Sequence, residues 1–436
     1  MRILLLTSYF FPDEHIGASR WNRLSKYLLQ MGHEIFVVAS DNSGDYSITQ
    51  FFCTDIIRVN SYASIPDKML LKASNAKKNI FIEKKRQNYQ RETKDRTTRL
   101  YARVVDLAGK IARFPNIQWW STGQMVKAGM QFLGQCNIDI IVATHPFPGC
   151  LKAAAILSTR TKTPWVADMR DGWSSYYDLE YKPGSFLNRL IAMLERKYLK
   201  KASAVVAVNQ KLAESLQVNI NKTFVIPNSF DNDETPVLET MSRNIKSGHI
   251  SFSFAGTILP EHSWDIFLKG LAIFLSKNLE TKITINYFGN SFDILKTNAI
   301  NNGLDEHLLL NHGYLSKKQL KQELAKSDFL VVFCFNGPFG VTVTTGKIFD
   351  YMEAYKPVIV VGREDSELAL LVKTTGIGNI ASKPLDINNL LENYVKDAHA
   401  FLDAFKRQRK PTEIMKYSSS HTAQVYASLL SKLSRK

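Results

Sequence analysis

The chain opens with a buried strand, a turn and an amphipathic helix. Residues 2–9 contain the apolar run 3–6, which is typical of a strand that is covered on both faces. A turn-rich segment follows at 11–17, and apolar side chains then recur at helical spacing from Trp21 to Met31. Residues 34–39 form the next strand candidate. A strand–helix–strand start predicts a parallel α/β sheet, with a ligand at the carboxyl ends of its strands.

Short apolar runs recur along the rest of the chain in two series, separated by a polar stretch at 229–248. They are strand candidates because each is short and bounded by turn residues. The first series continues at 138–143, 164–169, 204–208 and 224–226, and the second lies at 250–254, 282–288, 329–335 and 358–361. We therefore expect two doubly wound, Rossmann-like α/β domains that face a cleft. The N-terminal domain is predicted at 1–228, the linker at 229–248, the second domain at 249–410 and a closing helix within 411–436.

The positive charge of the chain is concentrated at residues 68–113. Fourteen Lys or Arg against four Asp or Glu give this segment a net charge of +10, out of +16 for the whole chain. Apolar residues from Leu100 to Ile111 share one helical face, so part of the segment is amphipathic. A solvated helix, an anionic membrane surface, an anionic substrate and nucleic acid are the possible explanations. We expect an anionic membrane surface and no nucleic acid, because no nucleic-acid-binding motif accompanies the charge.

Other features of the sequence favour a cytoplasmic protein without a metal. The four cysteines form no Cys-x-x-Cys pair, and scattered thiols fit a reducing compartment. The apolar run at 3–6 is too short for a signal peptide, and the run at 329–335 is too short to span a bilayer. The protein would be peripheral on the inner face of the plasma membrane if 68–113 binds lipid. An Asp-x-Asp at 231–233 lies in the linker rather than after a strand, so no metal site is expected.

Residues 344–358 contain the most informative local chemistry. They predict a loop, a short helix, a proline stop and a buried strand. Thr345 and Gly346 place a hydroxyl and backbone N–H groups at the helix start, where phosphate binds well. Lys347 adds a point charge suited to a diphosphate, and Asp350, one turn further, can accept hydrogen bonds from a ribose diol. A capped helix with a surface lysine and aspartate is the alternative.

A second charged cluster follows the apolar strand at 164–169. Three charged residues, Asp168, Arg170 and Asp171, lie at the carboxyl end of this strand, which is the end that faces the expected cleft. Charges in such a place must be paired with one another or must bind a ligand. Trp173 can stack on the flat face of a sugar ring. An internal Arg–Asp ion pair is the alternative interpretation.

Motifs spread over almost the whole chain resemble those of a known family. They are Tyr-Phe-Phe-Pro-Asp-Glu-x-x-Gly-Ala-Ser-Arg at 9–20, Gly-His-Glu at 32–34, Trp-Val-Ala-Asp-Met-Arg-Asp-Gly-Trp at 165–173, Val-Ile-Pro-Asn at 225–228, Phe-Ala-Gly-Thr at 254–257 and the stretch 344–358. The chain resembles the retaining, family-4-like GT-B glycosyltransferases, in particular their bacterial polysaccharide, O-antigen and capsule branch. The resemblance implies transfer of a sugar, with retention, from a nucleotide-sugar to a saccharide or polyprenyl-linked acceptor. It implies no cofactor, because the nucleotide-sugar is a substrate.

The resemblance also assigns roles to individual residues. Gly17 matches the glycine that lets the backbone approach phosphates and acceptor. His145, after a strand that we expect to end at residue 143, lies in the region of the histidine that touches the donor sugar, and Tyr314 lies in the segment that contacts the nucleotide base. We assign His145, Lys347 and Asp168 to catalysis, Gly17, Tyr314, Thr345, Gly346, Lys347 and Asp350 to the donor, and Arg20, Arg170, Asp171 and Trp173 to the acceptor or sugar.

The sequence departs from the family at several positions. Thr342 stands where many relatives have the first of two glutamates, and Asp350 shortens the second. Thr257 and His262 stand where relatives often have Arg and Lys. The charge of a diphosphate would then be met mainly by Lys347 and backbone N–H groups, with Arg20 as a further candidate. A nucleotide-sugar 2-epimerase of the same fold, and an inactive donor-binding or scaffolding homologue, are the alternative functions.

Overall fold

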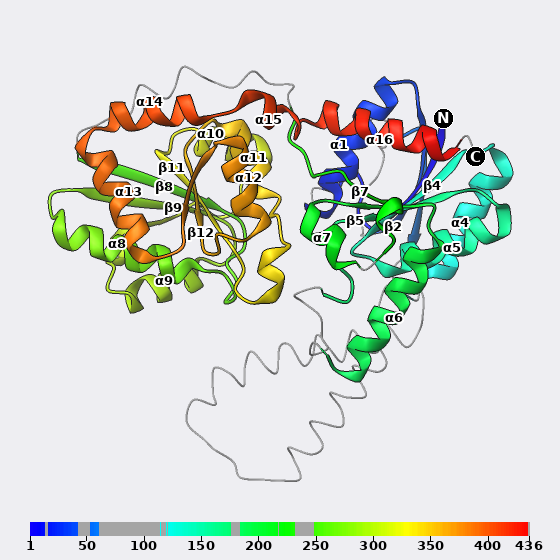
Figure 1. Ribbon diagram of the computed structural model, residues 1–436, viewed down its shortest axis with the longest axis horizontal. Coiled ribbons are helices and arrows are strands. Elements are labelled where there is room, and N and C mark those ends of the chain that lie inside the picture. Colours follow the sequence, from blue (N-terminus) through cyan, green and yellow to red (C-terminus); the bar gives the residue numbers. More distant parts are fainter. Residues whose placement is uncertain are drawn as a thin grey trace, which may run out of the picture. The chain divides into compact units, whose positions relative to one another are not determined.

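The computed structural model describes residues 1–13, 16–41, 53–60, 114, 119, 121–175, 184–216, 218–231 and 248–434. The chain forms two compact units (Figure 1). The first unit comprises residues 1–206, 216–224 and 427–436, and the second comprises 207–215 and 225–426. The basic segment 68–113 lies outside the described residues, as does most of the expected linker.

The first unit is built on a seven-stranded sheet with the order β3-β2-β1-β4-β5-β6-β7. β1 pairs in parallel with β2 and with β4, and its residues from Ile3 to Leu6 are fully buried because both faces of the sheet are covered. The strand order reverses between β1 and β4, which is where such a sheet opens a crevice. The elements up to residue 225 are β1 (Arg2–Thr7), α1 (Ile16–Gln30), β2 (Glu34–Asp41), β3 (Asp55–Asn60), α4 (Thr122–Gln135), β4 (Ile140–His145), α5 (Pro148–Thr161), β5 (Trp165–Met169), α6 (Phe186–Lys201), β6 (Ala204–Ala207), α7 (Gln210–Ser215) and β7 (Thr223–Val225).

The second unit is built on a six-stranded sheet with the order β10-β9-β8-β11-β12-β13. Alternate residues of its central strands enter two apolar cores, one shared with α8 and α13 and the other with α11 and α12. The order reverses between β8 and β11. The elements are β8 (His249–Ala255), α8 (Trp264–Lys277), β9 (Lys282–Phe288), α9 (Phe292–Asn301), β10 (Leu309–Asn311), α10 (Lys317–Leu324), β11 (Phe329–Phe333), α11 (Lys347–Ala354), β12 (Val358–Val361), α12 (Glu367–Thr375), β13 (Gly378–Ala381), α13 (Pro384–Lys396), α14 (Ala398–Gln408), α15 (Pro411–Met415) and α16 (Ser419–Ser434).

The predicted fold class is confirmed, because both units are parallel, Rossmann-like α/β sheets. One correction concerns β4, which extends to His145 instead of ending at residue 143, so His145 is the last residue of a strand rather than part of a loop. The strands β3, β10 and β13 were not predicted, and all three lie at sheet edges. Among the described residues, no helix is both long and apolar enough to cross a membrane.

The chain is well ordered where the linker was expected to begin. Ser229 is buried, and the N–H of Phe230 donates to the carbonyl of Tyr417 at 3.0 Å. The following helix, α16, is assigned to the second unit as far as Tyr426 and to the first unit from Ala427 onward. In the first unit, its Ser434 hydroxyl lies 3.4 Å from the sulfur of Met1.

Candidate active site

The start of α11 lies at the carboxyl edge of the second sheet, beyond β11. Gly346 precedes the helix and provides no side-chain cap. Within the described part of the chain, the backbone N–H groups of Thr345, Gly346 and Lys347 have no hydrogen-bond acceptor. Such N–H groups at a helix start present positive partial charge and bind anions well. The three residues that we assigned to the donor diphosphate therefore form a turn with N–H groups available to an anion, and their contact with a diphosphate stays a prediction.

The side chain of Lys347 extends from this turn across the end of β8. Its Nζ lies 4.9 Å from the centre of the Phe254 ring. Gly256 makes room for it: with φ at +109°, a Cβ at Gly256 would lie 2.1 Å from Cε of Lys347. No carboxylate forms an ion pair with the ammonium among the described residues. Burial lowers the pKa of Lys347 to about 8, against a smaller opposing effect of Asp350, so the side chain is mainly a cation at neutral pH.

Two side chains, each through two hydrogen bonds, fix the position of α11 and of the loop before it. The hydroxyl of Tyr351 accepts the N–H of Ala255 at 3.1 Å and donates to the carbonyl of Val331 at 3.2 Å, which joins α11 to β8 and β11. On the loop, Nδ2 of Asn209 donates to the Thr342 carbonyl at 2.7 Å and to the Thr344 hydroxyl at 3.0 Å. The turn at residues 345–347 is therefore held at both of its ends.

His262 does not replace the positive charge that relatives have at this place. It is only 6% exposed, its Nδ1 accepts the N–H of Leu259 at 3.2 Å, and its ring meets the Phe335 ring edge-on with centroids 4.5 Å apart. Burial, and then the charge of Lys347, lower the pKa of His262 to about 4. The imidazole is therefore neutral at physiological pH.

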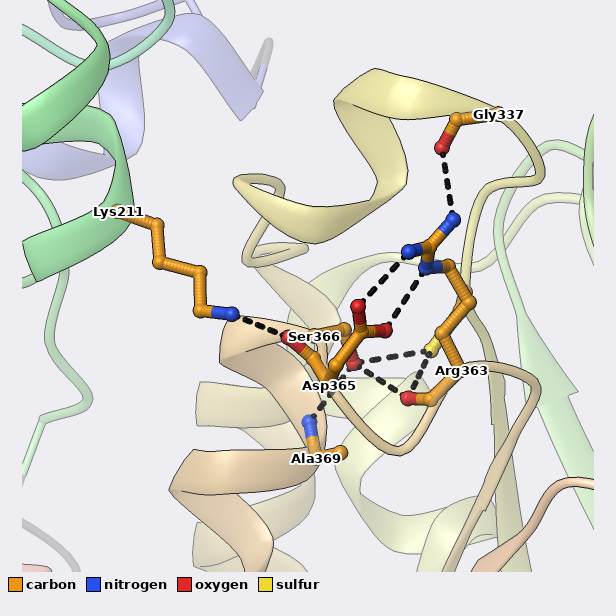
Figure 2. Close-up of polar contacts among 7 residues, drawn as sticks. Lys211, Gly337, Arg363, Asp365, Ser366 and Ala369 are labelled. Atoms are coloured by element: carbon orange, nitrogen blue, oxygen red, sulfur yellow. Dashed lines mark hydrogen bonds and ion pairs between the residues drawn. The ribbon is translucent and has the colours of Figure 1, made fainter.

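Arg363, which follows β12, is also charged but has a partner within its own loop (Figure 2). Its guanidinium makes a bidentate ion pair with Asp365 at 2.9 and 2.8 Å. Ser366 closes the loop: its hydroxyl donates to the Arg363 carbonyl at 2.9 Å and accepts the N–H of Ala369, which caps α12. Because the charge of Arg363 is neutralised by Asp365, Lys347 is the better candidate to bind an anion.

The other residues assigned to the donor lie in the same unit. Asp350 is one turn along α11 and is partly exposed. Tyr314 follows β10 and is 69% exposed, but β9 lies between β10 and β8. It therefore lies two strands away from the lysine side chain at the end of β8. The contacts of both residues with a nucleotide stay predictions.

In the first unit, Asp168 and Arg20 form a fully buried ion pair. Asp168 has no exposed surface and Arg20 is 4% exposed. The guanidinium reaches both carboxylate oxygens, the shortest distance being 2.9 Å, and the indole N–H of Trp21 donates to the same carboxylate at 2.9 Å. Asp168 is thus in an internal ion pair, but with Arg20 of α1 instead of the neighbouring Arg170. The pair joins α1 to β5. Their predicted contacts with a ligand gain no support from this placement.

The remaining candidates of the first unit surround His145, at the carboxyl end of β4. Its Nδ1 lies 3.0 Å from the backbone carbonyl of Asp171, and burial lowers its pKa to about 3. The guanidinium of Arg170 donates to the carbonyl of Gly17, which brings the loops after β1 and β5 together. Burial raises the pKa of the Asp171 carboxyl. These contacts bring the loops after β1 and β5 together with the end of β4, and the roles of the four residues stay predictions.

Trp173 is placed differently from our expectation. It is 3% exposed, and its ring packs against Trp119 with centroids 5.8 Å apart. Because its ring packs on Trp119, the predicted stacking of Trp173 on a sugar stays a prediction. Sequence reasoning also missed Glu195 of α6, which holds the backbone of Trp173 at 2.7 Å. No local signal distinguishes this acid from the surface acids of an amphipathic helix.

Each unit therefore has a site at the reversal of its strand order, and the site of the second unit offers a cation and unpaired N–H groups. Among the described residues, no group of three or more His, Cys, Asp or Glu side chains could hold a metal ion. This arrangement suits a phosphate-containing ligand in an α/β protein of two nucleotide-binding-type units.

Comparisons with known proteins agree with this class. Residues 17–229 match the family model described as Glycosyl transferase 4-like domain. Anabaena Alr3699/HepE in complex with UDP-glucose is similar at 14% identity and TM-score 0.61, covering 99% of this chain and 100% of that chain. A glycosyltransferase from Rickettsia africae ESF-5 is similar at 13% identity and TM-score 0.61, covering 99% and 98%. The lipopolysaccharide outer core galactosyltransferase WaaB is similar at 11% identity and TM-score 0.57, covering 99% and 100%. No curated protein sequence matches the chain.

The fold is that of the GT-B glycosyltransferases. At these identities the structural similarity shows the fold alone, whereas the domain match concerns the sequence. The match of residues 17–229 to this family model, together with the GT-B fold, supports transferase activity.

Proposed function

We propose that this protein transfers a sugar, with retention of the anomeric configuration, from a nucleoside-diphosphate sugar to a saccharide acceptor. The observation that carries the proposal is the cationic Lys347 beside the unpaired N–H groups of the α11 start. Breaking a glycosyl–phosphate bond leaves negative charge on the departing diphosphate. A fixed cation and fixed N–H dipoles stabilise that charge without reorganisation. Because similar structures contain UDP or UDP-glucose, UDP-sugars are the first donors to test.

In the proposed reaction, the residues divide between the two substrates. Lys347 and the turn from Thr345 bind the diphosphate, Asp350 binds the ribose, and Tyr314 lies near the base. His145 touches the donor sugar, and Gly17 lets backbone approach the phosphates and acceptor. The leaving phosphate takes the proton of the acceptor hydroxyl on the same face of the sugar. We assign no nucleophilic carboxylate of the type that retaining glycosidases use.

Removal of the Lys347 charge tests the donor site. We expect Lys347→Ala to weaken UDP binding by about 1–3 kcal/mol, the usual range for a charge-assisted hydrogen bond, when measured by isothermal titration calorimetry. Lys373→Ala is the matched control, because Lys373 is an exposed lysine of α12 in the same unit. Unchanged UDP affinity in a folded Lys347→Ala protein would refute the site.

The proposed acceptor is lipid-linked, as in the synthesis of cell-surface polysaccharides, and the enzyme works in the cytoplasm on the inner face of the plasma membrane. Support comes from the sequence of 68–113, with its net +10 and apolar helical face. Co-sedimentation with vesicles tests this part separately. Binding should require anionic lipid, weaken with salt, and fall when Lys84, Lys85 and Arg86 are changed to Glu. Equal recovery with neutral and anionic vesicles would remove the membrane role.

Product analysis separates the proposal from its alternatives. Incubation of the full chain with UDP-sugars and saccharide or polyprenyl-linked acceptors should give a glycosylated acceptor. An epimeric nucleotide-sugar as the product would assign the chain to the 2-epimerases instead. UDP binding without any turnover would favour a donor-binding homologue.

A further inference from the structure

Glu195 of α6 is a buried carboxylate that accepts three hydrogen bonds from one loop. It is 4% exposed. Its Oε1 accepts the N–H of Trp173 at 2.7 Å, and its Oε2 accepts the N–H of Ser174 at 3.3 Å and also the Ser174 hydroxyl. Burial raises the pKa of Glu195, and these hydrogen bonds oppose the rise. Because burying a carboxylate is costly unless it is bonded, the three donors fix the backbone of the loop.

The same loop determines the state of His145. The carbonyl of Asp171 lies 3.0 Å from Nδ1 of His145. A carbonyl oxygen only accepts hydrogen bonds, so Nδ1 carries the proton and Nε2 has a free lone pair. The indole of Trp173 packs beside the imidazole with centroids 6.3 Å apart. Residues 171–173 therefore fix both the tautomer and the orientation of the ring.

Nε2 of His145 is buried and has no hydrogen-bond partner among the described residues. A buried polar atom without a partner is rare in folded proteins and costs free energy. The ring is also neutral, because burial lowers its pKa to about 3. A neutral imidazole with a free Nε2 accepts a hydrogen bond from a hydroxyl group, which is the group that a sugar offers.

We infer that Glu195 is a positioning residue: by fixing residues 171–174, it holds His145 in the tautomer protonated on Nδ1 and leaves Nε2 free for a sugar hydroxyl. The inference rests on the proposed function, in which His145 touches the donor sugar. Glu195 acts through the loop and does not itself touch the sugar. Asn188, also on α6, supports the same loop by donating to the Ser174 carbonyl at 2.8 Å.

The tautomer of His145 can be measured without any ligand. The full chain is labelled with ¹⁵N-histidine, and the resonances that disappear in His145→Gln are assigned to His145. In the wild-type protein at pH 7.5 we expect a protonated Nδ1 and an unprotonated Nε2. Glu195→Gln replaces one of the accepting carboxylate oxygens by an NH2 group, which cannot accept a hydrogen bond from the N–H groups of the loop. We expect the loop to be released and the spectrum of His145 to show a mixture of both tautomers.

Two variants control this measurement. Glu34→Gln removes an acid from the same unit that lies on the surface, in an ion pair with Arg2, and it should leave the His145 spectrum unchanged. Ser174→Ala removes one of the three donors and should change the tautomer in the same direction by a smaller amount. It also keeps the inference testable if Glu195→Gln does not fold. An unchanged tautomer in either folded variant overturns the inference.

Kinetics with UDP-glucose as the probe give a second readout. We expect Glu195→Gln to lower kcat by about 10- to 100-fold, as for other losses of a group that orients a reacting residue, with little change in KM. Glu195→Asp keeps the charge and should restore part of kcat. An unchanged kcat in a folded Glu195→Gln protein would contradict the inference. Absence of turnover in the wild-type chain would count against the proposed function alone, since the tautomer is measured independently.

Discussion

Asp168 and Lys347 carry opposite charges at the carboxyl edges of two parallel sheets, and their surroundings give them different roles. Asp168 is fully enclosed by Arg20 and Trp21, so its charge is used within the fold. Lys347 has an aromatic ring and a glycine beside it and no carboxylate within ion-pair distance in the described part of the chain. From the sequence, Asp168 could be recognised as a charge at the end of a strand and Lys347 as a charge at the start of a helix. Their partners could not, because Arg20 is 148 positions from Asp168 and meets it only in the tertiary structure.

Loss of the Asp168 charge should destabilise the first unit. Asp168→Asn removes the carboxylate charge that the buried Arg20 guanidinium contacts, and we expect the free energy of unfolding to fall by about 3–5 kcal/mol in urea denaturation. Glu34→Gln is the control, because the ion pair of Glu34 with Arg2 is 44–47% exposed and should contribute about 1 kcal/mol or less. A similar loss of unfolding free energy for the two substitutions would show that the buried ion pair contributes no more to stability than the exposed one.

The pKa of Lys347 predicts how UDP binding depends on pH. Burial lowers this pKa to about 8, so the ammonium is present below that pH and is lost above it. A diphosphate binds the cation, and we therefore expect UDP affinity to fall as the pH rises from 7 to 9. Lys347→Arg keeps its charge throughout this range and should bind with little dependence on pH. Equal pH profiles for the two proteins in calorimetric titrations would argue against Lys347 as the titrating group.

At the level of elements, buried strands were predicted most readily, although the exposed edge strand β7 was also predicted. The central strands are apolar because helices cover both of their faces, and the sequence predicted them to within a few residues. The missed strands β3, β10 and β13 are edge strands, where one side of the backbone is unpaired and exposed residues such as Asp55 and Leu310 occur. The helix start at Lys347 was predicted from its sequence. The close approach of Gly256 was not, because the two residues are distant in the chain.

Gly256→Ala should distort the backbone directly after β8 and should thereby disturb the proposed donor site. At φ +109° an L side chain is strained, and the added Cβ would also displace Lys347. Gly303→Ala is the matched control: Gly303 has φ +78° but no atom within 4 Å of an added Cβ. Both should lose about 1–2 kcal/mol of stability from backbone strain. Only Gly256→Ala should weaken UDP binding, and a comparable loss in both variants would refute the role of Gly256.

At the level of the whole molecule, the alternation of strands and helices was enough to predict two Rossmann-like units. It did not predict how the chain divides between them, since the sequence suggested single cuts near 228 and 410. The chain instead passes from one unit to the other at 206, 215, 224 and 426. Short segments such as 207–215 join a unit through tertiary contacts that no local pattern indicates. The role of 68–113 stays a prediction from its charge.

Sugar transfer by this protein should not require a divalent metal. The expectation rests on the absence of an Asp-x-Asp after any predicted strand, and on Lys347 and backbone N–H groups as the partners of the diphosphate. Transfer from the donor should therefore survive treatment with EDTA, measured with and without added magnesium or manganese. Loss of activity with EDTA and recovery with either metal would contradict this mechanism.

The path of α16 has a consequence for biosynthesis. Residues 427–434 lie in the same unit as β1 and reach Met1, yet they follow the whole of the second unit along the chain. Because synthesis runs from the N-terminus to the C-terminus, the second unit has all of its residues once Tyr426 has been made. The unit that contains β1 is begun earlier, but it has all of its residues only later.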